Sequence, residues 1–256
     1  MFQPLKSLLV GLAVAVGMSA AHAEKMTIAA AADLKFALTE IVTEYKTSHP
    51  KDDIEVVFGS SGKFSSQIQQ NAPYDLFFSA DILYPRELVK AGDAIGPAHP
   101  YAYGRIVLWS NTLDASKMTL ESLTGADIKR VAIANPKHAP YGKRAEEALK
   151  AAGVWDKVEP KLVYGENISH TAQLVETGNA QVGVIALSLA LNPKLAAQGK
   201  YWLIPDKLHE PLEQAFVITK RGADNPVAKS FAAYMEGPQA RAVMKRYGFV
   251  LPGELK

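Results

Sequence analysis

Short apolar runs alternate with stretches of helical periodicity along most of the chain. Residues 26–30 form an apolar run that predicts a strand, and Leu34, Leu38 and Ile41 then recur at helical spacing. By the same criteria, strands are predicted at 54–58, 75–79, 105–109, 130–134, 161–164, 182–185 and 215–219, and helices at 62–70, 85–90, 141–152, 169–177, 226–235 and 238–247. This alternation is typical of α/β folds, whose ligands bind at the carboxyl ends of the parallel strands.

The first 23 residues follow a different pattern. Lys6 is the only charged residue before an apolar run at 7–18, SLLVGLAVAVGM, which is shorter than the roughly 20 residues that span a bilayer. Ala21, His22 and Ala23 then form a small-x-small sequence of the kind that signal peptidases cleave. We therefore expect residues 1–23 to be a secretory signal peptide, cleaved after Ala23, and the remaining chain to be periplasmic with no membrane span.

Composition and charge exclude several classes of protein. The 256 residues include 28 Lys and Arg, 26 Asp and Glu, and no Cys. Because the charges nearly balance and the basic residues are scattered singly, no nucleic-acid partner is expected. Without cysteine the chain has no thiol nucleophile, no cysteine-ligated zinc and no iron–sulfur cluster. The histidines lack the H-E-x-x-H spacing of zinc hydrolases.

Three loops that follow predicted strands are rich in small and hydroxyl-bearing residues. They are AAAADL at 29–34, GSSGK at 59–63 and NPKHAPYG at 135–142. Helix N-termini present unpaired N–H groups and the positive end of a dipole, so several of them facing one cleft would form an anion site without a full positive charge. Helix capping alone explains any one of these loops, but three of them in one alternating fold favour binding.

Two catalytic motifs resemble the second loop, and both fail. A phosphate-binding P-loop needs a glycine at the position of Val57 and a hydroxyl at that of Phe64. A G-x-S-x-G nucleophile elbow needs a residue between its serine and its second glycine, whereas Gly62 follows Ser61 directly. No nucleophile–base pair is apparent, so an enzyme is not predicted, and a secreted hydrolase is the weaker alternative.

Six blocks, taken in order, cover essentially the whole chain after residue 23. They are TIAAAADLKFAL, FGSSGKFSSQI, APYDLFFSAD, RVAIANPKHAPYGKRAEEALKAAGVWD, PKLVYGENISHTAQLVETGNAQVGVI and GPQARAVMKRYGF. In these blocks the chain resembles the periplasmic molybdate-binding proteins, the extracytoplasmic substrate-binding components of molybdate ABC importers. The resemblance implies that the protein captures molybdate, and tungstate, and delivers it to a membrane permease.

The resemblance also implies the fold and the domain organisation. A type II periplasmic binding protein has two α/β lobes with mainly parallel sheets, joined by crossing strands. We expect lobe 1 to comprise residues 24–104 and 213–256, lobe 2 to comprise 105–212, and the protein to be a monomer. No cofactor is expected, and metal is bound only as the molybdate or tungstate oxyanion. A binding protein for sulfate, phosphate or a metal ion would share this fold and remains an alternative.

The family's oxyanion contacts fall on Asp33, Ser61, Tyr141 and Ile168, by resemblance. Ser61 keeps both its hydroxyl and its N–H, and Tyr141 and Ile168 would donate through the backbone. Asp33 is a departure, because many members have serine there. A carboxylate beside a dianion is unfavourable unless it is protonated, paired with a cation or turned away. A tyrosine donor of well-known members falls on Ala186, which offers no hydroxyl.

Other side chains could compensate for these departures. We hypothesise that Lys63, with Lys35, neutralises Asp33 or reaches the anion, because a lysine at a helix N-terminus is otherwise poorly placed against the dipole. The alternative is a solvent-facing Lys63, as is usual for lysine. Tyr141, or secondarily Ser188, could supply the hydroxyl that Ala186 lacks.

Overall fold

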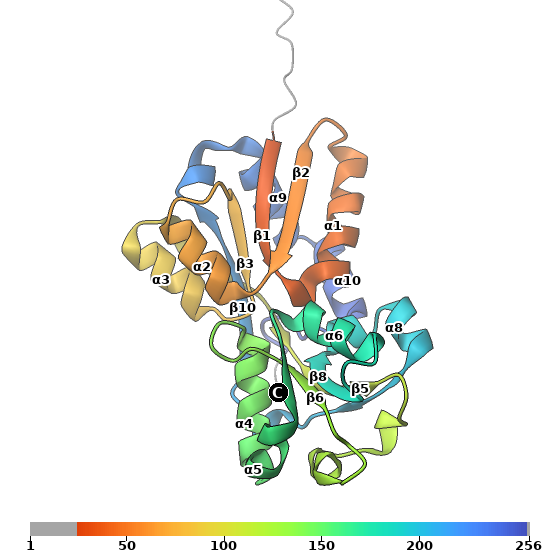
Figure 1. The fold of residues 1–256 in the computed structure, drawn as a ribbon. Helices are drawn as coiled ribbons and strands as arrows, with labels where there is room; N and C mark the ends of the chain where they lie inside the picture. Colours follow the sequence, from red (N-terminus) through yellow and green to blue (C-terminus); the bar gives the residue numbers. More distant parts are fainter. Residues whose placement is uncertain (1–24, 255–256) are drawn as a thin grey trace, which may run out of the picture.

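The computed structural model describes residues 25–254, so the predicted signal peptide and its cleavage site lie outside the described residues. The strands form two five-stranded sheets, each covered by helices, and the two halves of the molecule lie one above the other in Figure 1. We call the half built on the first sheet lobe 1 and the half built on the second sheet lobe 2. The predicted pair of α/β lobes is therefore confirmed.

Lobe 1 contains a sheet with the strand order β2-β1-β3-β10-β4. Its strands are β1 (Lys25–Ala31), β2 (Asp53–Gly59), β3 (Leu76–Ser79), β4 (Ala94–Gly104) and β10 (Leu212–Thr219). Helices α1 (Lys35–Ser48), α9 (Pro226–Glu236) and α10 (Pro238–Arg246) cover one face, and α2 (Ser61–Gln69) and α3 (Leu83–Ala91) cover the other. Successive side chains of a strand point to opposite faces, so the neighbours Phe77 and Phe78 enter two different hydrophobic clusters.

Lobe 2 contains a sheet with the strand order β7-β6-β8-β5-β9. Its strands are β5 (Ile106–Ser110), β6 (Val131–Ala134), β7 (Leu162–Gly165), β8 (Val182–Ala186) and β9 (Lys200–Leu203). Its helices are α4 (Pro140–Ala151), α5 (Trp155–Val158), α6 (Ile168–Glu176), α7 (Leu187–Ala190) and α8 (Pro193–Gln198). One hydrophobic cluster fills this lobe, with Trp109 of β5 fully buried in it. Within residues 25–254, no helix is both long and apolar enough to cross a bilayer.

In each sheet four of the five strands run in the same direction and one runs against them, which confirms the prediction of mainly parallel sheets. In lobe 1, β1 pairs in parallel with β2 and β3, whereas β10 is antiparallel to β3 and β4. In lobe 2, β6 pairs in parallel with β7 and β8, whereas β5 is antiparallel to β8 and β9. The physical reason is that β5 and β10 enter their sheets from the other lobe, at the edge where the parallel strands end. The carboxyl ends of both parallel sets therefore face the junction of the lobes.

Candidate ligand-binding site

Four helical segments begin at the junction between the lobes. The 3₁₀ helix η1 (Ala32–Leu34) and α2 begin after strands of lobe 1, and α4 and α6 begin after strands of lobe 2. Their first residues enclose a cavity of about 10 Å³, which is lined by Ala31, Ala32, Asp33, Gly59, Ser60, Ser61, Ala80, Ala139, Pro140, Tyr141 and Ile168. All four residues that carry the family's oxyanion contacts by resemblance are in this set. A cavity of this size has room for about one water molecule, so the lobes enclose the site tightly.

Ser61 is the first residue of α2 and is fully buried. The backbone N–H of Ala80 donates a 3.0 Å hydrogen bond to the Ser61 hydroxyl oxygen. This contact uses the oxygen as an acceptor, so the hydroxyl proton stays available to a ligand. Gly59 and Ala80 also line the cavity, and a Cβ at Gly59 would collide with the ring of Phe64.

Tyr141 and Ile168 bring the N-termini of α4 and α6 to the same cavity. Tyr141 follows Pro140, the first residue of α4, which has no N–H to offer. Ile168 is the first residue of α6, and Asn167 caps this helix by accepting a 2.9 Å hydrogen bond from the N–H of His170. The N–H groups of a first helical turn have no partner inside the helix and carry the positive end of its dipole. The arrangement therefore presents donors to an anion from lobe 2, opposite Ser61 of lobe 1.

Asp33 is buried, and neutral groups surround its carboxyl group. Tyr141 Oη donates a hydrogen bond of 3.0 Å to Oδ2, and Gln214 Nε2 donates one of 2.8 Å to the same oxygen. The other oxygen, Oδ1, is buried with no hydrogen-bond partner. Burial raises the pKa of Asp33 to about 7, although the hydrogen bonds from Gln214 and Tyr141, together with the nearby backbone N–H groups, act to lower it.

The orientation of Gln214 is fixed by a second tyrosine. Tyr101 Oη donates a 2.7 Å hydrogen bond to Gln214 Oε1, so the Gln214 amide N–H groups must face Asp33 and Tyr141. Gly104, at the end of β4, leaves the space for this arrangement, because a Cβ there would collide with Tyr141 Oη and Gln214 Nε2. We call Asp33, Tyr141, Gln214 and Tyr101 the interior network. It joins both lobes with no ion pair.

Tyr141 and Ser188 were the two candidates to replace the hydroxyl donor missing at Ala186, and the hydroxyl groups of both donate hydrogen bonds to Asp33. Ser188 Oγ donates a 2.8 Å hydrogen bond to the Asp33 carbonyl oxygen, and Tyr141 Oη donates to the Asp33 carboxyl group. Ser188, in α7, therefore ties the two lobes together and does not line the cavity. Ala186 is buried at the end of β8.

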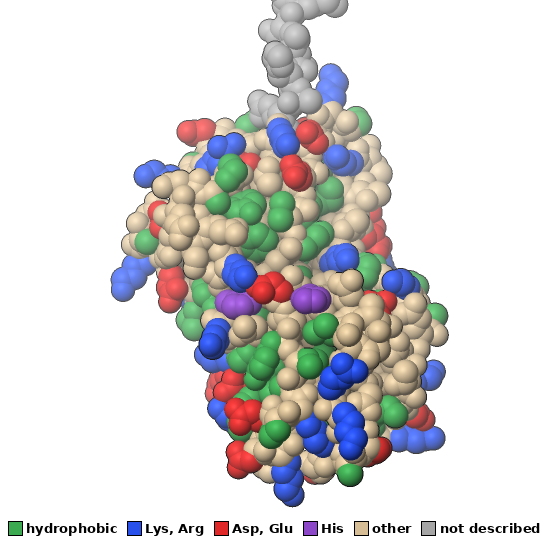
Figure 2. Space-filling model, viewed as in Figure 1, with side chains coloured by type: hydrophobic (Ala, Val, Ile, Leu, Met, Phe, Trp, Pro, Cys, Tyr) green, Lys and Arg blue, Asp and Glu red, His purple; other side chains and the backbone are tan. Residues whose placement is uncertain are grey.

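Charged side chains gather at the rim of the cleft, outside the cavity. Lys63 Nζ forms an ion pair with Glu166, and both side chains are about half exposed. His138 Nε2 lies 3.6 Å from the Glu166 carboxylate, and His138 Nδ1 lies 3.0 Å from Ser60 Oγ. We call Lys63, Glu166 and His138 the rim cluster. Figure 2 shows basic, acidic and histidine side chains close together at the waist between the lobes. Lys63 thus pairs with Glu166 and not with Asp33, and its direct contact with the anion stays a prediction.

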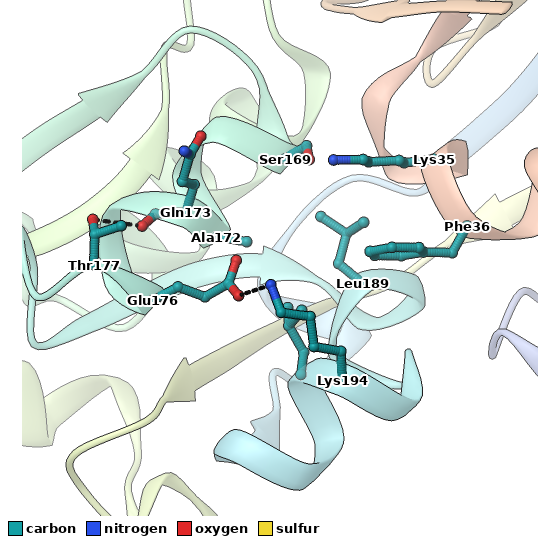
Figure 3. A pocket seen from close by; sticks show the side chains of 10 residues that line it. Lys35, Phe36, Ser169, Ala172, Gln173, Glu176, Thr177, Leu189 and Lys194 are labelled. Atoms are coloured by element: carbon teal, nitrogen blue, oxygen red, sulfur yellow. Dashed lines mark hydrogen bonds and ion pairs between the residues drawn. The ribbon is translucent and has the colours of Figure 1, made fainter.

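Lys35 lies in a different and larger cavity, of about 350 Å³, on the side of the molecule. Figure 3 shows its ammonium group pointing from lobe 1 toward Ser169 of α6, with Phe36 beside it. Glu176 and Lys194 form a 3.0 Å ion pair across this cavity. Lys35 therefore does not pair with Asp33 either. Within residues 25–254, no group of three His, Asp or Glu side chains is placed to hold a metal ion.

Comparison with known proteins places the chain in a family. The model of the bacterial extracellular solute-binding proteins matches residues 26–250. The chain belongs to this family. The solute-binding protein superimposes on the solved structure of the Azotobacter vinelandii periplasmic molybdate-binding protein with a TM-score of 0.83 and 31% identity, covering 89% of this chain and 99% of that one. The predicted type II periplasmic binding protein fold is confirmed.

Two curated relatives match the solute-binding protein over almost its entire length. The molybdate-binding protein ModA of Rhodobacter capsulatus is 36% identical over 253 residues, which cover 97% of both chains. The ModA protein of Azotobacter vinelandii is also 36% identical over 253 residues, covering 96% of this chain and 98% of that one.

The hydrogen-bond partners of Asp33 are not apparent from the sequence. Gln214 and Tyr101 are both buried, and they come from β10 and β4, far from Asp33 in sequence. One signal was present, because Gln214 is a polar residue within the apolar run of β10 (LEQAFVIT). Buried polar side chains need hydrogen-bond partners, but nothing in the sequence says which ones.

Proposed function

We propose that this solute-binding protein captures molybdate, and tungstate, between its lobes and delivers the ion to an ABC-type membrane importer. The observation that carries the proposal is the 36% identity to molybdate-binding proteins over 97% of the chain, together with a cavity formed at four helical N-termini. No lysine or arginine is among the residues that line this cavity. Helix N-termini and hydroxyl groups are suited to hold a desolvated dianion without a cation.

We assign the donors to both lobes. Ser61 would donate through its hydroxyl and its N–H from lobe 1, and Tyr141 and Ile168 would donate through their N–H groups from lobe 2. Because these contacts form together only when the lobes are closed, the bound ion would favour the closed state over the open one. The residues that line the cavity come from both lobes, so an ion would enter it when the lobes separate.

The hinge of this motion would lie in the segments that cross between the lobes. We propose lobe boundaries at 104/105 and 212/213, at the passage from β4 to β5 and at the start of β10. The protein would act as a periplasmic monomer that docks on a membrane permease. It would bind stoichiometrically, with no catalysis and no cofactor. Metal would enter only inside the oxyanion.

A ligand panel tests the proposal. The protein, expressed from 24 onward, is melted in the presence of molybdate, tungstate, sulfate, phosphate or zinc, because a ligand raises stability in proportion to the logarithm of its concentration over its Kd. We expect molybdate and tungstate to raise the melting temperature more than sulfate or phosphate at equal concentration. Stabilisation by sulfate equal to that by molybdate would overturn the assignment, and stabilisation by zinc alone would indicate a metal-ion carrier.

A further inference from the structure

Asp33 is the only carboxyl group among the residues that line the cavity, and it is an unusual neighbour for an anion. The side chain is 1% exposed. Its Oδ1 is buried with no hydrogen-bond partner, whereas its Oδ2 has two. A buried polar atom without a partner costs free energy, so this oxygen calls for an explanation that involves the cavity's occupant.

The hydrogen bonds of the interior network determine which oxygen can carry a proton. Tyr101 donates to Gln214 Oε1, which leaves the Gln214 amide as a donor to Asp33 Oδ2 and to Tyr141 Oη. The Tyr141 hydroxyl accepts from Gln214 and therefore donates its own proton to Oδ2. Because Oδ2 already accepts two hydrogen bonds, a proton on the carboxyl group would be bound to Oδ1.

The charges around Asp33 do not favour its ionised form. Of the elements packed against η1, α1 brings the exposed Lys35 and α6 brings the exposed His170, while α7 has no titratable residue. Strand β2 brings the exposed Asp53 and Glu55, which lie in the half of the strand away from η1. The rim cluster pairs Lys63 with Glu166, and the remaining titratable neighbours are Tyr101 and Tyr141. Among the described residues no cation bonds to the Asp33 carboxyl group. An ionised Asp33 would face a dianion across a dry cavity, where repulsion between like charges is strong.

We propose that Asp33 takes part in capture as a neutral carboxylic acid, whose Oδ1–H donates a hydrogen bond to an oxygen of the bound oxyanion. This inference rests on the proposed function and adds to it that capture of each dianion is coupled to one proton. Molybdate is held through its oxygens, so none of these residues is a metal ligand. The proton is taken from the solvent buffer when Asp33 is ionised in the free protein, and it stays on Oδ1 while the anion is bound.

The coupling has a definite sign. Burial already raises the pKa of Asp33 to about 7 in the closed protein, and a neighbouring dianion raises it further. Binding therefore takes up a proton, and affinity is lost as the pH rises. Between the pKa of Asp33 in the free protein and its pKa in the complex, the Kd should rise by about tenfold per pH unit, as expected for one linked proton.

Isothermal titration with sodium molybdate between pH 6 and pH 9 tests this coupling, with the wild type and Asp33→Asn compared. The amide N–H of the variant can donate in place of the Oδ1–H but cannot titrate. We expect the wild-type Kd to climb with pH and the variant's Kd to stay flat, so that the variant binds more tightly at pH 9. Titrations in buffers of different ionisation enthalpy should give about one proton taken up per anion by the wild type at high pH, and none by Asp33→Asn.

Two further variants keep the result interpretable. If Asp33→Asn does not fold, Asp33→Ser provides a shorter non-titrating donor. His138→Asn removes the imidazole of the rim cluster, and it should keep the wild-type slope because the proton belongs to Asp33. A flat Kd in the wild type, or a slope lost in His138→Asn, would overturn the inference. Absence of molybdate binding by the wild type and both Asp33 variants at every pH would instead refute the proposed function.

Discussion

The two lobes are connected by two clusters of contrasting character. The interior network joins Asp33 and Gln214 to Tyr141 by hydrogen bonds between neutral or neutralisable groups that are fully buried. The rim cluster joins Lys63 to Glu166 by an ion pair that is about half exposed. Water screens the rim charges, so their attraction is weak. In the buried interior, charged side chains of this kind would interact strongly with a bound dianion. The contrast suggests that the buried part of the cleft is kept free of other charges so that it can hold the charge of the ligand.

Gly104→Ala should weaken molybdate binding more than the other substitutions, because it disrupts the interior network. The added Cβ would collide with Tyr141 Oη and Gln214 Nε2. Separating these buried groups leaves donors and acceptors without partners, at about 1–3 kcal/mol each. We expect the Kd for molybdate to rise by at least about thirtyfold, which corresponds to about 2 kcal/mol.

Gly237→Ala is the matched control for this substitution. Gly237 lies between α9 and α10, and the nearest atom to a Cβ built there is the Tyr234 carbonyl oxygen at 3.1 Å. Calorimetry should find unchanged affinity in this variant. If Gly104→Ala binds as tightly as Gly237→Ala does, the interior network does not govern closure.

Ser61→Ala should give an intermediate effect, because it removes one donor and leaves the network intact. A hydrogen bond to a charged group contributes about 1.5–3 kcal/mol. The Kd should therefore rise by about 10- to 150-fold. The melting temperature of the ligand-free protein should also fall, because the buried Ala80 N–H loses its acceptor.

Ser66→Ala offers a comparison within the same helix. The Ser66 hydroxyl donates to the Gly62 carbonyl oxygen on the exposed side of α2. We expect calorimetry to find its affinity equal to that of the wild type. Equal affinities for Ser61→Ala and Ser66→Ala would mean that the Ser61 hydroxyl serves only as the acceptor for the Ala80 N–H and does not bind the anion.

Lys63→Ala should give the smallest effect, because it acts at the rim. Loss of an exposed ion pair changes the affinity by less than about fivefold, and added salt should reduce even this difference. Titrations at low and at high ionic strength measure it. A loss above thirtyfold that persists in high salt would mean that Lys63 reaches the anion, and the division between rim and interior would fail.

Most helices and strands could be predicted from the sequence, because each buries one face and therefore shows a regular pattern of apolar residues. The predicted strand at 26–30 corresponds to β1 (Lys25–Ala31), and the predicted helix at 141–152 corresponds to α4 (Pro140–Ala151). Two strands, β4 and β9, were not predicted. Both lie at the edges of their sheets. Strand β4 contains Pro97 and Pro100, which an edge strand tolerates although prolines in a sequence argue against a strand.

The site was predictable only in part. Ser61 and Ile168 were assigned by resemblance to the molybdate-binding proteins, and each is the first residue of a helix that follows a strand. The environment of Asp33 could not be predicted, because Gln214 lies 181 residues away and reaches it only through the crossing of β10 between the lobes. The direction of β5 and β10 in their sheets could not be predicted either, because an apolar run has the same pattern in a parallel and in an antiparallel strand.

The entry of β5 and β10 from the junction has a consequence for how such a protein diversifies. Because the parallel strands of both lobes end at the junction, the cavity is lined mainly by short loops and helix starts. The lining residues that also belong to the hydrophobic cluster of lobe 2 are Ala31, Ala32, Ala80, Ala139, Tyr141 and Ile168. Substitutions at lining positions outside this cluster, such as Ser61, could change the ligand while both lobes keep their packing. Selectivity and folding stability would then depend on largely separate positions of the same cavity.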